Sequence, residues 1–498
     1  MHALEHHLLP RPQSIVFRKQ LFRLRETISI RASDCPLDSQ AILQLQEDLK
    51  NFANVESKLI PNDDSEAEAA IHLEQLNTTD EAYRLTISPN GIRITGSARG
   101  IFYAIQTFAQ ILANTPPQGL PCCEIDDAPR YAERSVMLDL GRAPYSFALI
   151  QRIITILARL KLNTLHLHLN DDQLCGLRFE FLPLGSENPF ALTLAELAKI
   201  VRFGKKYHVK IIPEFESWGH AGSTVFHYPH LYGGPGRWEG VSFGIGQKLY
   251  PVLRSVYAEI LSVCDRQSIF HVGMDEAIWT VLPGENAEQH SPQTHLLTLH
   301  QILREEAENQ GKDVQMRMWW DHQPMTLPEE LREHISVEPW AYNRSQSDEI
   351  ARKVKACSQG GLHFMMGVGM SSLHLQGAYD ATRTWCFQGR NAASAEGVNM
   401  CIWETNDFSS QLFGIFVGAD YAWHPRSFEA PENDAFGERE RGKLFLKMRH
   451  WQNCFSEANP VFIDNDRGRE VYRGRYVWHE KNTPEYVAPT ADSAPVSS

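Results

Sequence analysis

The sequence predicts an α/β protein: a (β/α)8 TIM barrel preceded by a small α+β domain and followed by a C-terminal extension. From residue 134 onward, short apolar runs alternate with helical patterns, and most of the runs end in charged or aromatic residues. Parallel strands that are covered by helices on one face and packed together on the other are apolar along their whole length. The predicted barrel strands are 135–141, 164–170, 210–216, 268–274, 314–320, 336–341, 363–369 and 399–405, and helical patterns fill most gaps, as at 146–160, 193–207 and 347–356.

The composition changes near residue 125, and the segment before it predicts the small domain. Residues 82–96 alternate apolar and polar side chains around a Pro-Asn-Gly turn, which is typical of a β-hairpin. Residues 98–113 carry apolar side chains at helical spacing. We therefore divide the chain into a small α+β domain (1–125), a catalytic barrel (126–425), a helical C-terminal extension (426–482) and a flexible tail rich in Pro, Ser and Ala (483–498).

Charge and cysteine content exclude several classes of function. The net charge of −13 comes from 61 acidic and 48 basic residues spread over 498 positions, which disfavours nucleic acid and anionic membranes as partners. No signal peptide and no uninterrupted apolar stretch of membrane-spanning length is visible. The nine cysteines lack CxxC spacing, so we expect reduced thiols, no metal, no cofactor and a cytoplasmic location.

The fourth predicted barrel strand ends in two adjacent carboxylates, Asp275 and Glu276. Neighbouring residues of a strand point to opposite sides, so the two can share a site only where the strand ends and the chain turns. Two carboxylates held close do not both ionise easily, which makes one of them a usable acid near neutral pH. Alone, such a pair is also typical of a solvated strand end.

Six of the other predicted strands also end in carboxylates, His, Arg or Trp. Each end taken singly is also typical of an ordinary polar rim beside a core aromatic. Together they predict a carbohydrate site, because aromatic faces bind the apolar faces of sugars while carboxylates, Arg and His bind the hydroxyls. The strand-end segments are Leu140 to Arg142, Asn170 to Asp172, Glu214 to His220, Trp319 to Asp321, Glu338 to Trp340, and Trp403 to Asn406.

Over residues 80 to 425 the sequence resembles glycoside hydrolase family 20, the β-N-acetylhexosaminidases. The family resemblance implies the barrel, the small domain before it, and a glycan or glycoside substrate with a terminal β-linked N-acetylhexosamine. The motifs that carry it are Ala98-Arg-Gly-Ile-Phe-Tyr-Ala-Ile-Gln-Thr107, Arg134-Ser-Val-Met-Leu-Asp-Leu-Gly-Arg142, Lys161-Leu-Asn-Thr-Leu-His-Leu-His-Leu-Asn-Asp-Asp-Gln173, Ile212-Pro-Glu-Phe-Glu-Ser-Trp-Gly-His-Ala221 and His271-Val-Gly-Met-Asp-Glu276.

The resemblance also implies roles for the catalytic pair. In this family the nucleophile is the substrate's own acetamido oxygen, not a second carboxylate of the protein. Glu276 would be the general acid and base, and Asp275 would orient the 2-acetamido group and stabilise the positive charge of an oxazolinium-type intermediate. The reaction implied is exo-acting, retaining hydrolysis.

Further residues would bind the sugar by the same resemblance. Arg142 would donate a fork of hydrogen bonds to ring hydroxyls, and Asp171 and His220 would form a supporting pair behind the acid. Trp319, Trp340 and Trp403 would enclose the acetamido group and the ring, with Asp321 as a polar partner and Glu404 on outer hydroxyls. Trp320 is the alternative to Trp319, because a shift of one residue turns a side chain to the other face.

The chain departs from the family pattern in three places. Met274 stands where the family usually has Gly, the seventh strand lacks the family's Tyr and Asp, and Glu404 directly follows Trp403 where the family places one residue between them. Met274 either narrows the pocket or turns away. Substitutes for the missing strand-seven groups are Ser371, Ser372 and His374, or Tyr379 with Asp380.

Two alternatives to a β-N-acetylhexosaminidase stay open. One is a galactosamine-selective or otherwise unusual glycosidase of the same family, since the shift of Glu404 affects the recognition of the outer hydroxyls. The other is a barrel that binds glycans without catalysis, which the changes in strands seven and eight favour and the presence of both Asp275 and Glu276 opposes. A protein nucleophile, if one is used, would come from Glu214, Glu216, Glu338 or Glu404.

Overall fold

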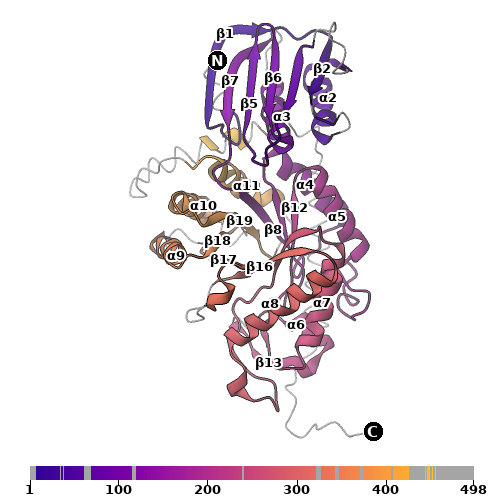
Figure 1. Ribbon diagram of the computed structural model, residues 1–498, viewed down its shortest axis with the longest axis vertical. Helices are drawn as coiled ribbons and strands as arrows, with labels where there is room; N and C mark the ends of the chain where they lie inside the picture. Colours follow the sequence, from indigo (N-terminus) through magenta and orange to yellow (C-terminus); the bar gives the residue numbers. More distant parts are fainter. Residues whose placement is uncertain are drawn as a thin grey trace.

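The computed structural model describes residues 7–33, 35–36, 39–60, 69–114, 119–237, 240–320, 327–342, 347–370, 375–404 and 408–425, with 443–444, 446–448, 451 and 455 beyond them. Figure 1 shows an N-terminal sheet with two helices at one end of the molecule and the barrel at the other. The predicted fold class is confirmed. The predicted helical extension and tail lie almost wholly outside the described residues.

The N-terminal part is a mixed sheet with strand order β1-β7-β5-β6-β4-β2-β3, packed against two helices. The predicted hairpin and helix are both confirmed, and β7 runs just past the boundary predicted at residue 125. Ser97 begins the helix α3 by accepting a hydrogen bond from the N–H of Gly100. The elements are β1 Ser14–Phe22, β2 Thr27–Ser33, α2 Gln40–Ala53, β3 Glu56–Ile60, β4 Ile71–Gln75, β5 Tyr83–Ser88, β6 Gly91–Gly96, α3 Ala98–Ala113 and β7 Leu120–Asp127.

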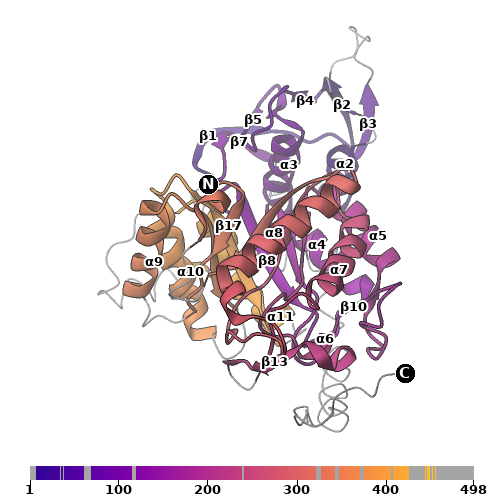
Figure 2. The same ribbon diagram turned by 60° about the horizontal axis from the view of Figure 1, so that its bottom comes forward.

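Eight parallel strands close the barrel in the order β12-β15-β16-β17-β18-β19-β8-β9, with helices around it (Figure 1 and Figure 2). Each predicted strand is present with small shifts at its ends. The barrel elements are β8 Glu133–Asp139, α4 Phe147–Arg159, β9 Thr164–His168, α5 Leu194–Lys206, β12 Lys210–Glu214, α7 Tyr250–Val263, β15 Gln267–His271, α8 Pro292–Asn309, β16 Asp313–Trp319, β17 Ile335–Glu338, α9 Ser347–Gln359, β18 His363–Gly369, α10 Leu375–Gly389, β19 Ala395–Ile402 and α11 Phe408–Trp423.

Short elements extend the loops that follow strands β9, β12, β15 and β16. The segment after β12 carries a small helix and a hairpin, which lie at the end of the molecule opposite the N-terminal sheet (Figure 1). The C-terminal ends of the barrel strands face this hairpin, so the expected site lies far from the small domain. These elements are β10 Leu177–Arg178, β11 Leu192–Thr193, α6 Gly222–His227, η1 Pro229–Leu231, β13 Tyr232–Pro235, β14 Val241–Phe243, η3 Ala287–Gln289 and η4 Glu329–Leu331.

Buried ion pairs join the N-terminal sheet to the barrel. Lys161 Nζ lies 3.1 Å from Asp127 Oδ2 and 4.3 Å from the ring centre of Trp423. Arg159 Nη2 lies 2.7 Å from Asp48 Oδ1 on α2. Breaking a buried pair leaves an uncompensated charge, so these contacts hold the two parts in one fixed orientation. No helix in the described ranges is both long and apolar enough to cross a bilayer.

The opposite, N-terminal end of the barrel holds a charged cluster around Arg317 of β16. Its guanidinium lies 2.6 Å from Glu133 Oε1 and 3.0 Å from Glu396 Oε2, and Ser336 donates a 2.7 Å hydrogen bond to the same Glu396 oxygen. A cavity of about 1440 Å³ opens here and is lined by strand-start residues that include Lys210. The Arg317 guanidinium is thus paired with two carboxylates.

Candidate functional site

The turn that ends strand β15 carries the two adjacent carboxylates. The strand stops at His271, and Gly273, Met274 and Glu276 take φ angles of 68°, 87° and 48°. Positive φ in residues other than glycine is strained and is kept where the surroundings enforce it, commonly at functional sites. A Cβ on Gly273 would lie 2.0 Å from Glu216 Oε2, so only glycine fits. The turn brings Asp275 and Glu276 to one site, as predicted.

Both carboxylates face the imidazole of His220. Its Nε2 lies 3.4 Å from Glu276 Oε2 and 3.7 Å from Asp275 Oδ2. The side chains of all three residues keep between 12 and 17% of their area exposed, so a ligand can reach them while most water is excluded. One imidazole therefore links the two acids electrostatically.

Two aspartates contact the other ring nitrogen of His220. Its Nδ1 lies 3.3 Å from Asp171 Oδ1 and 3.2 Å from Asp172 Oδ2. Burial opposes the charged imidazole, but the negative charges of Asp171 and Asp275 outweigh it and raise the pKa of His220 well above its usual value. The predicted Asp171 and His220 are thus in contact. Asp172 follows Asp171 in the same sequence motif, and the sequence analysis assigned it no role. It also accepts hydrogen bonds from the N–H groups of Gly222 and Val241.

Arg142 lies beside this group and is surrounded by carboxylates. Its guanidinium is 2.7 Å from Asp139 Oδ2, 3.1 Å from Asp171 Oδ2 and 3.6 Å from Glu404 Oε1. It also lies 5.0 Å from the ring centre of Trp403. Glu404 has a φ of 61° and its N–H donates to Asp139, so the end of β19 turns toward Arg142. The predicted Arg142, Asp171, Trp403 and Glu404 are therefore neighbours.

A fully buried layer of polar side chains lies beneath these groups. Sequence reasoning named Glu214 in this layer only as an alternative nucleophile and gave His168 no role. His168 of β9 lies between two carboxylates, with Nδ1 2.8 Å from Glu214 Oε2 and Nε2 2.9 Å from Asp171 Oδ2. Burial opposes the charged form of His168, but Glu214 and Asp171 outweigh it and raise its pKa to about 10. Although burial also opposes ionisation of Glu214, the charges of His168 and His271 hold its pKa well below the usual value.

Glu216, in the loop after β12, has the opposite electrostatic surroundings. Its side chain is fully buried, and burial together with the charges of Asp275 and Glu214 raises its pKa well above 4.5. The N–H of Met274 donates to Glu216 Oε2 at 3.2 Å. A neutral carboxyl at Glu216 can share its proton with Asp275, to which it is hydrogen-bonded. Sequence reasoning named Glu216 only as an alternative nucleophile, from its place in the strand-three motif.

Aromatic side chains form one wall of the site. Trp319 is 1% exposed and its ring centre lies 5.7 Å from that of Trp403. Trp340 packs against the same small cluster, and its ring lies 5.0 Å from that of Tyr342. Trp320, the alternative, packs against the main hydrophobic core instead. The three predicted tryptophans thus lie together.

Tyr342 was missed by sequence reasoning. It follows β17, but its ring packs on Gly369 at the end of β18, where an added Cβ would lie 2.7 Å from the ring. Trp403 Nε1 donates a 3.0 Å hydrogen bond to the Tyr342 hydroxyl. Burial and the nearby Cys401 raise the pKa of Tyr342, so it is a neutral phenol. Only a contact between neighbouring strands reveals it, and the sequence carries no signal for that contact.

The remaining expected residues fall in other places. Met274 is 2% exposed and packs into the hydrophobic core, so it turns away from the site. Tyr379 lies within α10, stacked on Phe413 of α11. Asp321, Ser371, Ser372, His374 and Asn406 lie outside the described residues.

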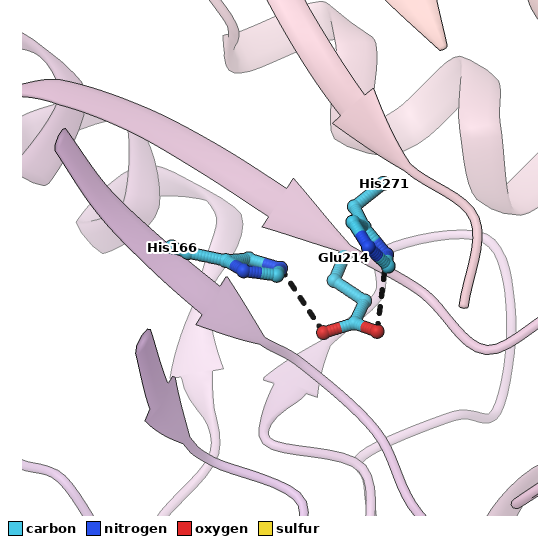
Figure 3. Close-up of side chains that lie close together, drawn as sticks. All are labelled: His166, Glu214 and His271. Carbon is cyan, nitrogen blue, oxygen red and sulfur yellow. Dashed lines mark ion pairs between the residues drawn. The ribbon is translucent and has the colours of Figure 1, made fainter. Parts of the chain in front are cut away.

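Two histidines and a glutamate in the barrel interior have the composition of a metal site (Figure 3). His166 Nε2 lies 3.0 Å from Glu214 Oε2, and His271 Nδ1 lies 3.1 Å from Glu214 Oε1. The two Glu214 oxygens are also contacted by His168 Nδ1 at 2.8 Å and by Trp319 Nε1 at 2.5 Å. His168 and Trp319 hydrogen-bond the carboxylate of Glu214, and His271 Nδ1 accepts the N–H of Gly273 at 3.1 Å, so we assign the cluster no metal.

Two models of one enzyme family match the chain. The model of the glycosyl hydrolase family 20 catalytic domain matches residues 131–359, and the model of domain 2 of that family matches residues 5–128. The catalytic-domain match stops before β18, so strands seven and eight, where the sequence departs from the family pattern, lie beyond it.

The sequence relatives include proteins named as β-N-acetylhexosaminidases or β-N-acetylglucosaminidases. A β-N-acetylhexosaminidase of Cellulomonas fimi is 28% identical over 336 residues, which are 62% of this chain and 62% of that protein. A chitooligosaccharidolytic β-N-acetylglucosaminidase of Ostrinia furnacalis is 30% identical over 40% of this chain and 37% of its own length. The matched part of the chain thus spans less than two thirds of the length of either relative.

The fold comparison covers nearly the whole chain. The structure of a chitobiase from Flavobacterium johnsoniae superimposes with a TM-score of 0.72 at 19% identity, covering 93% of this chain and 75% of that one. At this level of identity the likeness concerns the fold alone. With both family models matched in order from residue 5 to residue 359, the chain belongs to glycosyl hydrolase family 20.

Proposed function

We propose that the protein is an exo-acting, retaining β-N-acetylhexosaminidase that removes terminal β-linked N-acetylhexosamine. The observation that carries this proposal is that the strained turn after β15 brings Asp275 and Glu276 to one site. Their carboxylate oxygens lie 3.7 Å and 3.4 Å from His220 Nε2. A site with two acids and a polarising imidazole can transfer protons to a glycosidic oxygen. Family membership and the names of the sequence relatives support the same reaction.

In the proposed mechanism the substrate supplies the nucleophile. Glu276 protonates the glycosidic oxygen while the acetamido oxygen attacks the anomeric carbon, which releases the aglycone and leaves a cyclic oxazolinium. Asp275 accepts the acetamido N–H and stabilises the positive charge that develops on the ring. Glu276 then takes a proton from water, which opens the ring and restores the acetamido group with retained configuration.

The neighbouring residues orient the sugar in this proposal. Arg142 and Glu404, which lie 3.6 Å apart, offer a donor and an acceptor to hydroxyls at the non-reducing end. Trp319, Trp340 and Trp403 enclose the acetamido group and support the ring. Because Glu404 lies at the Arg142 side of the pocket, it is the residue we expect to set the choice between the gluco and galacto configurations.

Tyr342 is the hydroxyl we propose for the acetamido oxygen. Its ring packs on Gly369, the last residue of strand seven, and its hydroxyl is anchored by the indole of Trp403. A neutral phenol held in this way can donate its proton to a carbonyl oxygen. It would thereby take the part that the family resemblance assigns to a strand-seven tyrosine.

Hydrolysis of a panel of 4-nitrophenyl β-glycosides tests the proposal. We expect turnover of the N-acetyl-β-glucosaminide or N-acetyl-β-galactosaminide and far slower turnover of β-glucosides and β-galactosides, which lack the acetamido nucleophile. Proton NMR of the first product should show the β-anomer. Comparable rates on plain β-glucosides would contradict the proposal and direct the search to Glu338 or Glu404 as nucleophile.

A barrel that binds glycans without hydrolysing them is the second candidate. It is favoured only by the divergence of strands seven and eight. The strained turn and the charged His220 opposite two acids oppose it, because binding alone does not require them. Tight binding of N-acetylglucosamine by calorimetry together with no turnover on any substrate of the panel would select it.

A further inference from the structure

The histidine at the end of strand β9 is held in a way that only a charged imidazole satisfies. His168 is 1% exposed, and its two ring nitrogens point to different carboxylates, Glu214 Oε2 at 2.8 Å and Asp171 Oδ2 at 2.9 Å. Ionised carboxylates accept hydrogen bonds and donate none. Both nitrogens must therefore carry a proton if both contacts are hydrogen bonds, and a neutral tautomer would leave one carboxylate facing a lone pair.

Nearly all the titratable groups around His168 are acidic. Asp139 faces it from β8, Glu214 from β12, Glu216 from the loop after β12, and Asp171 from its own loop. His166 on its own strand faces it as well, but burial lowers the pKa of His166 and leaves that ring neutral. The edge of the ring meets Trp403 at a centroid distance of 5.2 Å. The net field of these groups favours a positive charge, in agreement with a pKa of about 10.

His168 connects two parts of the site. On one side Asp171 also contacts Arg142 and His220, and His220 in turn contacts Glu276. On the other side Glu214 accepts a 2.5 Å hydrogen bond from Trp319 Nε1 and so fixes the aromatic wall. The proton-transfer groups and the wall that encloses the acetamido group are thus attached to one buried imidazole and its carboxylate.

We infer that His168, held as an imidazolium by Glu214, is a positioning residue that fixes Asp171 and supplies the positive charge behind the His220–Glu276 contact. This inference rests on the proposed hydrolase function and extends it by one layer of side chains. His168 touches no substrate. The positive charge of His168 partly offsets the negative charge of Asp171, so Asp171 offsets less of the positive charge on His220. The positive charge that remains on His220 lowers the pKa of Glu276, the acid opposite it.

The variant His168→Gln tests this inference, with chitobiose as the substrate because its poor leaving group requires the acid. Gln keeps a hydrogen-bond donor, but the substitution removes one positive charge from the site. The pKa of Glu276 should therefore rise. We expect kcat to fall at least about tenfold and the alkaline limb of the kcat/KM profile to move up by about half a pH unit, less than a charge in direct contact would cause.

The matched control is His295→Gln. His295 is also fully buried, but its Nε2 contacts only the carbonyl of Ser217 at 3.1 Å, and burial lowers its pKa to about 4, so no charge is removed. We expect this variant to lose thermal stability without a shift of the limb. An unmoved limb in His168→Gln, or an equal shift in both variants, would overturn the inference.

A second measurement needs no variant, in case His168→Gln does not fold. A neutron crystal structure of the wild-type protein at pH 8 should show deuterium on both Nδ1 and Nε2 of His168. Deuterium on one nitrogen alone would overturn the inference. A wild-type protein that leaves chitobiose and the nitrophenyl N-acetylhexosaminides intact would contradict the proposed function instead, while the neutron map would still decide the charge of His168.

Discussion

The two ends of the barrel both bury charged side chains, but they compensate the charges differently. At the N-terminal end the Arg317 guanidinium is shared between Glu133 and Glu396, and this pairing holds the pKa of Glu133 low despite its burial. At the C-terminal end Asp275 lies against another acid, Glu216, whose pKa is raised. Paired charges make burial of the Arg317 guanidinium tolerable, whereas two acids held together shift a carboxyl pKa in the way that a proton-transfer site requires.

Both ends of the barrel hold residues other than glycine with positive φ angles. At the strand C-termini these are Met274, Glu276 and Glu404, with His220 in the loop after β12. At the N-terminal end they are Lys161 and His208, in the turns before β9 and β12. The ends differ in which residues are strained: at the C-terminal end they include the proposed acid, whereas no residue of the Arg317 cluster has such an angle.

The largest expected effect is loss of activity in Glu276→Gln. Gln keeps the shape of the side chain and removes the transferable proton, so turnover of chitobiose should fall by about 10²–10⁴-fold. The melting temperature and the affinity for N-acetylglucosamine should change little. Steady-state kinetics with calorimetry checks this, and wild-type turnover on chitobiose would show that another group is the acid.

At the opposite end, Arg317→Met should reduce stability without affecting chemistry. The change leaves the buried Glu133 and the partly buried Glu396 without their cation; breaking a fully buried pair typically costs about 3–5 kcal/mol. We expect a lower urea midpoint and an unchanged kcat on the protein that remains folded. A variant with normal stability and reduced kcat would contradict the division of roles between the two ends.

Two glutamates close together on β12 and its loop, Glu214 and Glu216, allow a comparison within the site itself. The folded pKa of Glu214 is lowered, so its charge contributes stability above pH 4.5, which is lost as the pH falls through its folded pKa. The folded pKa of Glu216 is raised, so its ionisation opposes folding as the pH rises above 4.5.

Their Gln variants should therefore behave in opposite ways at neutral pH. We expect Glu214→Gln to lower the melting temperature at pH 7 by more than at pH 4, and Glu216→Gln to leave it unchanged or raise it. Differential scanning fluorimetry from pH 4 to 8 measures both. Equal losses in the two variants at pH 7 would mean that Glu216 is ionised in the folded protein.

The smallest expected effect concerns Tyr342→Phe. The ring and its packing on Gly369 are kept, and one hydroxyl hydrogen bond is lost, which is typically worth about 0.5–1.5 kcal/mol. We expect kcat to fall by about tenfold with little change in stability. A matched change away from the site is Tyr257→Phe, whose hydroxyl contacts Ser217, and it should leave kcat unchanged.

Apolar periodicity was sufficient to predict the barrel, but it could not show how side chains meet across strands. The run from residue 268 predicted β15, yet the strand ends at His271 because Gly273 and Met274 turn the chain, a feature that only the adjacent carboxylates suggested. The charge of His168 depends on partners from β12 and from the loop after β9. Tyr342 follows one strand and acts beside the next, so no local pattern marks it.

The most direct test of the proposed substrate-assisted mechanism is the affinity for a thiazoline analogue of the cyclic intermediate, measured by calorimetry in wild-type protein and in Asp275→Asn. A site complementary to the transition state should bind the thiazoline at least about 10²-fold more tightly than N-acetylglucosamine. Most of this advantage should vanish in Asp275→Asn, because the charge that stabilises the ring is gone. Equal affinity for the thiazoline and the free sugar in wild-type protein would contradict the mechanism.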